Sequence, residues 1–229
     1  MNRISILLLL VVSITYMFPA MSFANDKVIV VTELSPPYQT IKDNVIGGSA
    51  TEKVKQYLNS KGVDYEIQMY PWARAYKLAT TKNNIMIYGI ANTKKREELF
   101  DWLIPVYEFK PYLVGLSGRA DLKIINLEQA KAFTIAVQRH DFTHGYLLSK
   151  GFEENKNIIL TNSIVDSWRL VKNNRVDFII EDTTFEPVID GKKINNKNYE
   201  KYLFLAELNT KTYLAASKSI SPKIKAKLK

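Results

Sequence analysis

The stretch from Val28 to Ile90 decides the fold. Its successive runs read VIVVT (28–32), SATEKVKQYL (49–58), YEIQMY (65–70), WARAYKLATT (72–81) and IMIYGI (85–90). The first, third and fifth runs are rich in β-branched and aromatic residues and predict strands. The second and fourth runs space their apolar residues three and four positions apart and predict amphipathic helices. Strands that alternate with helices are typical of βαβ units around parallel sheets.

Both predicted helices have start signals. Ser49-Ala50-Thr51-Glu52 follows Gly47-Gly48 and matches a capping box, in which Ser49 and Glu52 satisfy free backbone amides reciprocally. Pro71 stands at the start of the second helix, where a missing amide costs nothing. These signals place the helix starts near residues 49 and 71.

The same alternation resumes after Leu122, so the sequence predicts two lobes. Tyr112 to Leu116 predicts a strand that leaves lobe one, and Tyr213 to Ala216 a strand that returns to it. The expected fold is α/β, with each lobe a mainly parallel sheet flanked by helices and with two crossing strands between the lobes. The expected boundaries are 25–113 for the first part of lobe one, 114–210 for lobe two and 211–229 for the return. Further strands are expected at 133–137, 158–160 and 176–180, and helices at 142–149 and 164–171.

The N-terminus has the order of a secretory signal peptide. Arg3 precedes an apolar run from Ile4 to Ile14, and the small residues around Ala24 are followed by a polar start. The run is too short to span a bilayer as a helix, which needs about 20 residues. We therefore expect residues 1–24 to be removed after Ala24 and the protein to reach the periplasm.

Composition excludes several classes of function. The chain has no cysteine, so it can form neither a disulfide nor a thiol-linked lipid anchor. Its formal net charge is +9, but its lysines are scattered through polar turns and no nucleic-acid motif is present. Its two histidines suggest neither a metal cluster nor a Ser-His-Asp arrangement. We expect no cofactor, no metal and no nucleic-acid partner.

Several motifs together resemble a known family. Gly89-Ile90-Ala91-Asn92-Thr93-Lys94-Lys95-Arg96, with Phe100-Asp101 and Pro105-Val106-Tyr107 after it, is the most specific of them. Thr32-Glu33 with Pro36-Pro37-Tyr38, and Pro71-Trp72-Ala73-Arg74, are also similar. The chain resembles the type II periplasmic solute-binding proteins of the polar amino acid class, family 3 of the ABC-importer binding proteins, in a branch with a Pro-Trp-x-Arg motif. The resemblance covers essentially the whole chain after the predicted signal peptide.

The resemblance implies a site that holds an amino-acid-like solute between the lobes. It assigns the solute carboxylate to Arg96, whose planar fork can donate two parallel hydrogen bonds, and to the amides near Ala91 and Gly89. It assigns the ammonium group to Asp182, with Glu181 as the nearest competitor. A surface role for Arg96 and a helix-capping role for Asp182 are the alternatives.

Two aromatic residues are further candidates for this site. Tyr38 would form a wall over the aliphatic part of the solute, or would only pack within its loop. Trp72 is also a candidate, although its helical spacing favours the core.

The chain departs from the family pattern at three places. Ala91 replaces a common hydroxyl residue, and Arg139 with His140 replaces small residues in the second binding loop. We expect Arg139 to bind a second anionic group, which favours an anionic solute over a basic one; the alternatives are that it points away or blocks the cleft. The family has a further helix after Pro222, so we expect the lysine-rich residues 223–229 to fray and the chain to be incomplete at its C-terminus.

The expected function is delivery of the solute to an ABC permease in the inner membrane by a monomeric binding protein that is not an enzyme. One alternative is a dehydratase or glycan-cleaving enzyme of the same fold, for which Glu33, His140 and Glu181 are the candidate acids or bases. The other alternative is a ligand-sensing module.

Overall fold

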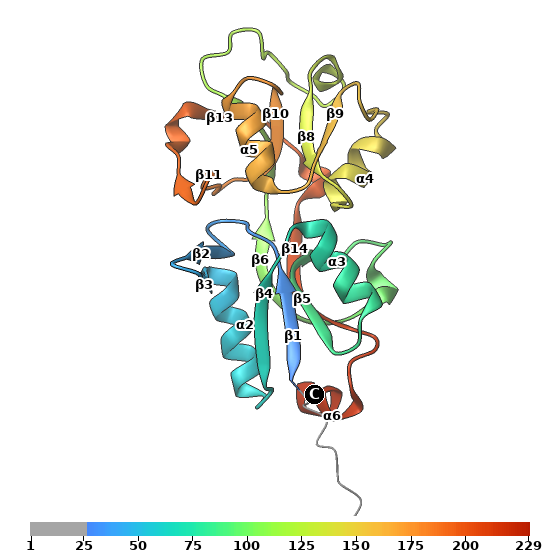
Figure 1. Cartoon of the computed structure of the whole chain (residues 1–229). Coiled ribbons are helices and arrows are strands. Elements are labelled where there is room, and N and C mark those ends of the chain that lie inside the picture. Colours follow the sequence, from blue (N-terminus) through green and yellow to red (C-terminus); the bar gives the residue numbers. More distant parts are fainter. Residues whose placement is uncertain (1–26) are drawn as a thin grey trace, which may run out of the picture.

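The computed structural model describes residues 27–229 and has two lobes, each built on a five-stranded sheet (Figure 1). The signal peptide expected at residues 1–24 lies outside the described residues. The sheet of lobe one has the order β4-β1-β5-β14-β6. Four of its five strands run in one direction, and β14 runs against them. These strands are β1 (Val28–Thr32), β4 (Tyr65–Met69), β5 (Ile85–Ala91), β6 (Phe100–Phe109) and β14 (Thr210–Ser217).

The sheet of lobe two has the order β13-β7-β10-β8-β9. Here β7 alone runs against the other four strands. The predicted mainly parallel, two-lobed α/β architecture is therefore confirmed. The strands are β7 (Pro111–Leu116), β8 (Ile135–Gln138), β9 (Ile158–Thr161), β10 (Phe178–Asp182) and β13 (Tyr199–Phe204).

Strand alternation sorts the helices of lobe one onto the two faces of its sheet. Val28 and Val30 of β1 pack with α2 (Ser49–Ser60) and α6 (Pro222–Leu228). Val31 points to the opposite face, where it packs with α3 (Trp72–Thr81). Because successive side chains of a strand point to opposite faces, one apolar strand serves both layers.

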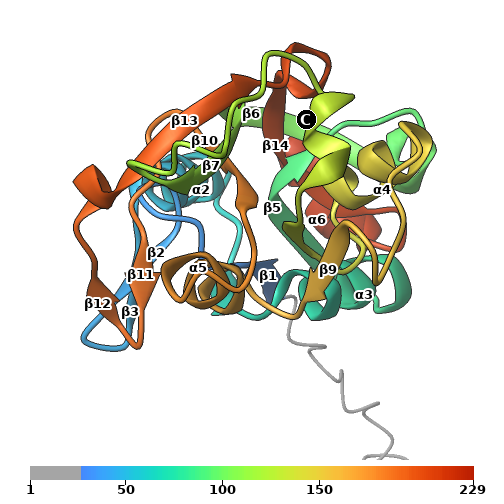
Figure 2. The same cartoon turned by 90° about the horizontal axis from the view of Figure 1, so that it is seen from above.

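Lobe two has the same layered arrangement (Figure 2). Its β8 contributes Ile135 and Val137 to a core with α4 (Phe142–Ser149) and Ala136 to a core with α5 (Ile164–Lys172). Each lobe also has a small hairpin, and short 3-10 helices complete the chain. The hairpins are β2 (Thr40–Lys42) with β3 (Val45–Gly47) and β11 (Val188–Ile189) with β12 (Lys192–Lys193); the 3-10 helices are Glu97–Leu99, Gln129–Ala132, Asn196–Asn198 and Ala206–Leu208.

The chain crosses between the lobes twice. The first crossing is at Lys110, between Phe109, which pairs with Thr210 in lobe one, and Pro111, which pairs with Asp182 in lobe two. The second lies between the end of β13 and the start of β14. The prediction that Tyr112 to Leu116 leaves lobe one is therefore wrong, because all of β7 belongs to the second sheet.

The start of α2 is built differently from the predicted capping box. Gly48 is its N-cap, and no side chain caps it. Backbone carbonyls of the preceding loop take over, since Ser49 N donates to Pro37 O and Ala50 N to Tyr38 O. Gly48 has a φ of +101°, and a Cβ there would lie 2.4 Å from Tyr38 O. The chain can approach this helix start so closely only at a glycine.

The predicted fraying of residues 223–229 is also wrong. Residues Pro222 to Leu228 form α6, and Ile224 is buried against lobe one. Ser221 caps the helix, and Tyr57 Oη donates to Leu228 O. One buried isoleucine and these bonds hold a segment whose lysines point outward.

Candidate functional site

Three connected cavities lie between the lobes. The central cavity is the smallest, about 60 Å³, and Glu33, Gly89, Gln138, Asp141 and Glu181 are among its lining residues. An apolar cavity of about 280 Å³ shares Glu33 and Gln138 with it. A basic cavity of about 710 Å³ lies on the other side and shares Asp141 with the central one. Together they form one cleft along the interface of the lobes.

Glu33 lies directly after β1 on the lobe-one wall of the cleft. Its Oε2 accepts a hydrogen bond from Nε2 of Gln138 at 2.8 Å, across the interface. Withdrawal from water, together with the negative charge of Asp141, raises the pKa of Glu33 to about 8. The carboxyl group is therefore predominantly protonated at neutral pH in the unliganded protein.

Glu181 faces the same central cavity from lobe two. It belongs to β10, a strand that is buried along its whole length. Burial raises its pKa to about 8, although Trp168 Nε1 and the backbone amide of Asp182 both donate hydrogen bonds to it. Two carboxyl groups from different lobes thus line one cavity, and each is held away from its ordinary pKa.

Asp182, the predicted ammonium ligand, accepts hydrogen bonds from other residues of the protein. Its Oδ2 accepts from Lys110 N at 2.7 Å, and its Oδ1 accepts from Thr184 N and from Tyr38 Oη, both at 2.9 Å. The side chain therefore fixes the first crossing and the turn after β10. The helix that the capping alternative expected is not formed, because residues 183 and 184 make a turn. Asp182 does not line the central cavity, whereas its neighbour Glu181 does.

Arg96, the predicted carboxylate ligand, is buried at the edge of the basic cavity. Its guanidinium lies 5.1 Å from the ring centre of Trp72 and 4.9 Å from that of Tyr76. Two hydrogen bonds to backbone carbonyls hold it, from Nη1 to Ala91 O at 3.5 Å and from Nη2 to His140 O at 3.2 Å. The alternative of a solvated surface arginine is wrong, because the side chain is only 5% exposed.

The backbone carbonyl of His140, in lobe two, accepts hydrogen bonds from side chains of lobe one. His140 has a φ of +62°, a left-handed conformation, and its carbonyl accepts from Arg96 and from Trp72 Nε1, the latter at 3.0 Å. Trp72 is itself buried in the core of lobe one, as its helical spacing predicted. The His140 side chain is exposed and lines the basic cavity.

Tyr107 and Gly89 line the central cavity from lobe one. The ring of Tyr38 stacks on that of Tyr107 at 3.8 Å between centres, but Tyr38 lines none of the three cavities, so its contacts match the loop-packing alternative. Gly89 lines the central cavity with a φ of +78°, at the point where the pairing of β14 with β5 shifts register. A Cβ there would lie 2.3 Å from Nε2 of Gln39. Ala91 is buried and contributes its carbonyl to Arg96.

Arg139 is exposed, and its side chain lines none of the three cavities described above. Of the three predicted options, the structure therefore favours the one in which it points away. Asp141 caps α4 by accepting from Thr143 N at 2.9 Å, as its position before the helix predicted.

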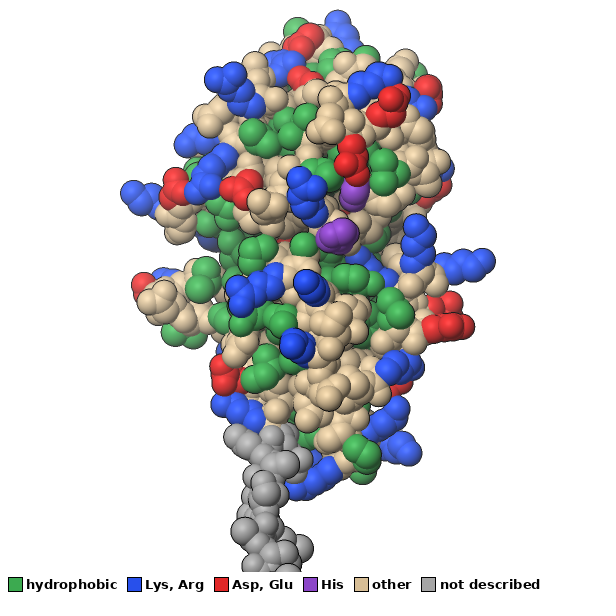
Figure 3. All heavy atoms as spheres, turned by 45° about the vertical axis from the view of Figure 1, so that its right-hand side comes forward, with side chains coloured by type: hydrophobic (Ala, Val, Ile, Leu, Met, Phe, Trp, Pro, Cys, Tyr) green, Lys and Arg blue, Asp and Glu red, His purple; other side chains and the backbone are tan. Residues whose placement is uncertain are grey.

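Charge is divided along the cleft. Carboxyl groups line the central cavity, and among the described residues around it there is no lysine, arginine or histidine. The basic cavity has Lys94, Lys95 and Arg96 on one side and His140 and His144 on the other. Figure 3 shows the histidine side chains at the waist between the lobes, with lysine and arginine side chains around it. The described part of the chain has no cluster of side chains suited to hold a metal ion.

Sequence reasoning gave too little weight to Glu33 and Glu181 as site residues and did not consider the side chain of Gln138 as a ligand. The available signal was their position, because Glu33 and Gln138 end or directly follow parallel strands, where open α/β sheets present their ligand groups. Across residues 27–229, no helix combines the length and apolar character that a membrane crossing requires.

Comparison with known proteins supports the fold. No protein-family model matches the chain, and no curated protein matches it. Among solved structures, a mutant of ArgBP from T. maritima superposes with a TM-score of 0.72 at 15% identity, covering 89% of this chain and 86% of that one. ArtJ from Geobacillus stearothermophilus, described as an arginine-, lysine- and histidine-binding protein, gives 0.68 at 20% identity, covering 88% and 86%. A histidine kinase sensor domain similar to periplasmic binding proteins gives 0.71 at 17% identity, with the same coverage.

Proposed function

We propose that the chain binds a small amino-acid-like solute between its lobes and holds the ammonium group of that solute with Glu33 and Glu181. The observation that carries this proposal is that carboxyl groups from both lobes, Glu33 from lobe one and Glu181 with Asp141 from lobe two, line the same cavity. A cation that leaves water needs an opposite charge, and a carboxylate also supplies hydrogen-bond acceptors. A bound ammonium group would in turn favour the charged form of both carboxyl groups.

Arg96 remains our proposed ligand for the carboxylate of the solute. Its guanidinium lies in the cavity next to the acidic one, and the two cavities share Asp141 and Phe142. A zwitterion that reaches from one cavity into the other would find both of its charges matched. Backbone carbonyls and two aromatic rings already orient the guanidinium, so little side-chain entropy would be lost on binding.

The lining of the cleft argues against the anionic solute that the sequence suggested. That expectation depended on Arg139, which is exposed and away from the cavities. With carboxyl groups around the central cavity, we propose a zwitterionic or cationic solute.

Delivery to a membrane permease in the periplasm is our proposed use of the bound solute. The solved structures with this fold include amino acid transporter binding proteins, which supports import, and a sensor domain, which supports sensing as the second candidate. Uptake of the labelled solute by cells that lack the gene would distinguish them, because uptake is lost only if the protein serves an importer.

An enzyme is a third candidate, favoured by one observation. Glu33, with its pKa near 8, could donate a proton at neutral pH as a general acid does. Chemical change of the solute on incubation with the protein would support this candidate. Recovery of unchanged solute would exclude it for that compound.

The binding proposal predicts selective stabilisation by solutes that carry an amine. In a thermal unfolding panel, a matching amino acid should raise Tm by about 5 to 10 °C at about 100 times its Kd, because it binds only the folded state. Glu33→Gln and Glu181→Gln should each remove most of this rise. Glu98→Gln, at an exposed site in lobe one, is the matched control and should keep the full rise. A dicarboxylate without an amine that stabilises the chain equally well would contradict the proposal.

Arg96→Ala tests the other end of the solute. In this variant, amino acids should no longer raise Tm. A simple amine without a carboxylate should raise Tm by the same amount in the variant and in the unchanged protein, because it binds only Glu33 and Glu181. An unaltered response to amino acids would remove Arg96 from the site.

A further inference from the structure

The apolar cavity is lined mainly by apolar side chains, which have no role in the proposed binding of the ammonium and carboxylate groups. Lobe one lines it with Ile41, Met69 and Tyr70, and lobe two with Ile164 and Val165. Glu33 is the only carboxyl group among its described lining residues, and no lysine, arginine or histidine lines it. A charged group placed here would have at most one partner.

Two of these residues present apolar surface for identifiable reasons. The hydroxyl of Tyr70 donates to Oε1 of Gln68 at 2.7 Å, so its polar atom is satisfied elsewhere. Ile41 lies on the β2-β3 hairpin and is 48% exposed, which is unusual for an isoleucine that borders a cleft. Covering such a side chain with apolar ligand surface is favourable, because it removes apolar area from water.

The apolar cavity is connected to the acidic one through a polar wall. Glu33 and Gln138 line both cavities. The amide of Gln138 is oriented by its Nε2, which donates to Glu33, and its Oε1 is buried without a hydrogen-bond partner among the described residues. A buried acceptor of this kind costs free energy until a donor reaches it. An N–H group next to Glu33 would satisfy it.

We propose that the solute carries an uncharged, apolar side chain, aliphatic or aromatic, which occupies the apolar cavity while its ammonium group binds Glu33 and Gln138 Oε1. This assignment rests on the proposed function and narrows it to amino acids with apolar side chains. A cationic side chain would compete with the ammonium group for Glu33, and an anionic one would find no cationic side chain among the described lining residues. The volume of about 280 Å³ gives room for a branched aliphatic or a phenyl group.

Calorimetric titration with a graded set of amino acids tests this assignment. The probes are L-alanine, L-leucine, L-phenylalanine, L-lysine and L-glutamate. We expect L-leucine or L-phenylalanine to bind at least about tenfold more tightly than L-alanine, since each buried methylene adds a severalfold gain. L-lysine and L-glutamate should bind more weakly than the apolar probes.

Two substitutions on one hairpin locate the side chain. Ile41→Asp places a charge in the apolar cavity and should weaken binding of the preferred apolar probe by about tenfold or more, with little change for L-alanine. Val45→Asp is the matched control, because Val45 is 64% exposed on the same hairpin and does not line the cavity. Both sites are exposed, so both variants should fold. Val165→Phe, which fills the cavity from lobe two, should show the same loss for the large probes and not for L-alanine.

The outcomes separate the two proposals. If L-lysine or L-glutamate binds most tightly and Glu33→Gln still abolishes that binding, the apolar side chain is wrong and the proposed function stands. If L-leucine binds equally well to the unchanged protein and to Ile41→Asp and Val165→Phe, its side chain lies elsewhere in the cleft and the inference is overturned. If no compound with an amine binds at all, the proposed function fails and the inference fails with it.

Discussion

Glu33 and Glu181 are the residues whose chemistry is most altered by the fold. They come from different lobes, and both have a pKa raised to about 8, mainly by removal from water. In an unfolded chain the same side chains titrate near 4.5. Between pH 4.5 and about 8, these two carboxyl groups are therefore protonated in the folded protein and ionised in the unfolded chain.

This difference predicts how stability changes with pH. Because the folded state binds more protons than the unfolded chain, stability without solute should fall as the pH rises from about 4.5 to 8. Urea unfolding at a series of pH values measures the slope. The double variant Glu33→Gln with Glu181→Gln should flatten it across this range. A wild-type slope of the opposite sign would show that these carboxyl groups are charged in the folded protein.

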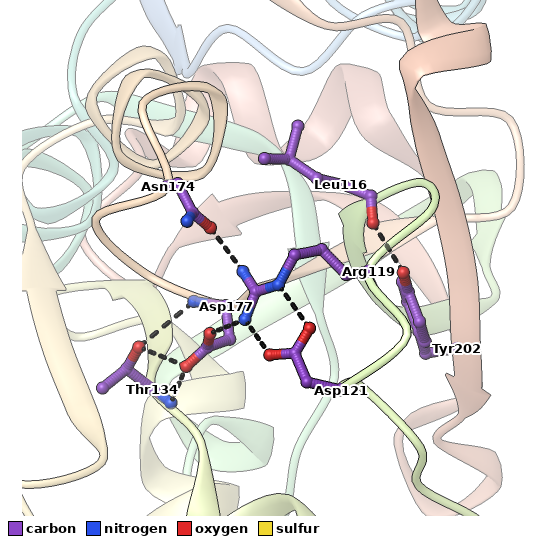
Figure 4. Close-up of polar contacts among 7 residues, drawn as sticks. All are labelled: Leu116, Arg119, Asp121, Thr134, Asn174, Asp177 and Tyr202. Carbon is purple, nitrogen blue, oxygen red and sulfur yellow. Dashed lines mark hydrogen bonds and ion pairs between the residues drawn. The ribbon is translucent and has the colours of Figure 1, made fainter.

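At the scale of single elements, side-chain networks hold the loop after β7 against the start of β10. Arg119 follows β7 and contacts Asp121 and Asp177 at once (Figure 4). Asp177 also accepts from Thr134 N at 2.8 Å and from Thr134 Oγ1 at 2.9 Å, which links β10 to the approach of β8. Asp177 thus connects Arg119 to Thr134, whereas Asp121 is an exposed partner of Arg119 alone.

The two aspartates therefore predict different losses of stability. Asp177→Ala should lower the free energy of unfolding by about 1 to 3 kcal/mol, because it leaves the backbone amide and hydroxyl of Thr134 without their acceptor and removes one of the two carboxylates that contact Arg119. Asp121→Ala removes one exposed ion pair and should cost under about 1 kcal/mol. Urea denaturation of both variants measures the difference. Equal losses would mean that Asp177 acts only through Arg119.

For the whole molecule, the contacts between the lobes determine how far the cleft opens. Trp72 Nε1 and Arg96 Nη2 both donate to His140 O, while Tyr38 Oη donates to Asp182 and Gln138 Nε2 to Glu33. These bonds join the lobes directly and stabilise the arrangement in which the lobes are in contact. A solute bound between the lobes would add to that stabilisation.

Removal of one such bond should shift the molecule toward an open form. Trp72→Phe keeps an aromatic ring but loses the donor to His140 O, a change of about 1 kcal/mol that shifts the ratio of closed to open molecules roughly fivefold. Small-angle X-ray scattering of the solute-free protein should then give a larger radius of gyration. Trp102→Phe is the control, because Trp102 Nε1 donates to Glu97 O within lobe one. An unchanged radius in Trp72→Phe would show that this bond does not hold the lobes together.

Local patterns in the sequence were sufficient for the layers of the fold. The strands at Val28–Thr32 and Ile85–Ala91 and the helix at Phe142–Ser149 follow from apolar spacing and turn residues, which act over a few positions. The same reasoning missed β6 and put the first crossing three residues too late. The two strands at 100–109 and 111–116 are separated by one residue, and local spacing does not show where the chain changes sheets.

The roles of the charged residues were decided only by the tertiary structure. The carboxylate of Asp182 accepts hydrogen bonds from Tyr38 and Lys110, which are 144 and 72 residues away in the sequence. Its neighbour Glu181 lines the cavity instead. The raised pKa of Glu33 needs the second lobe to exclude water from it. Local spacing specifies secondary structure because its interactions are local, whereas desolvation and charge pairing depend on groups that meet only after the lobes have closed.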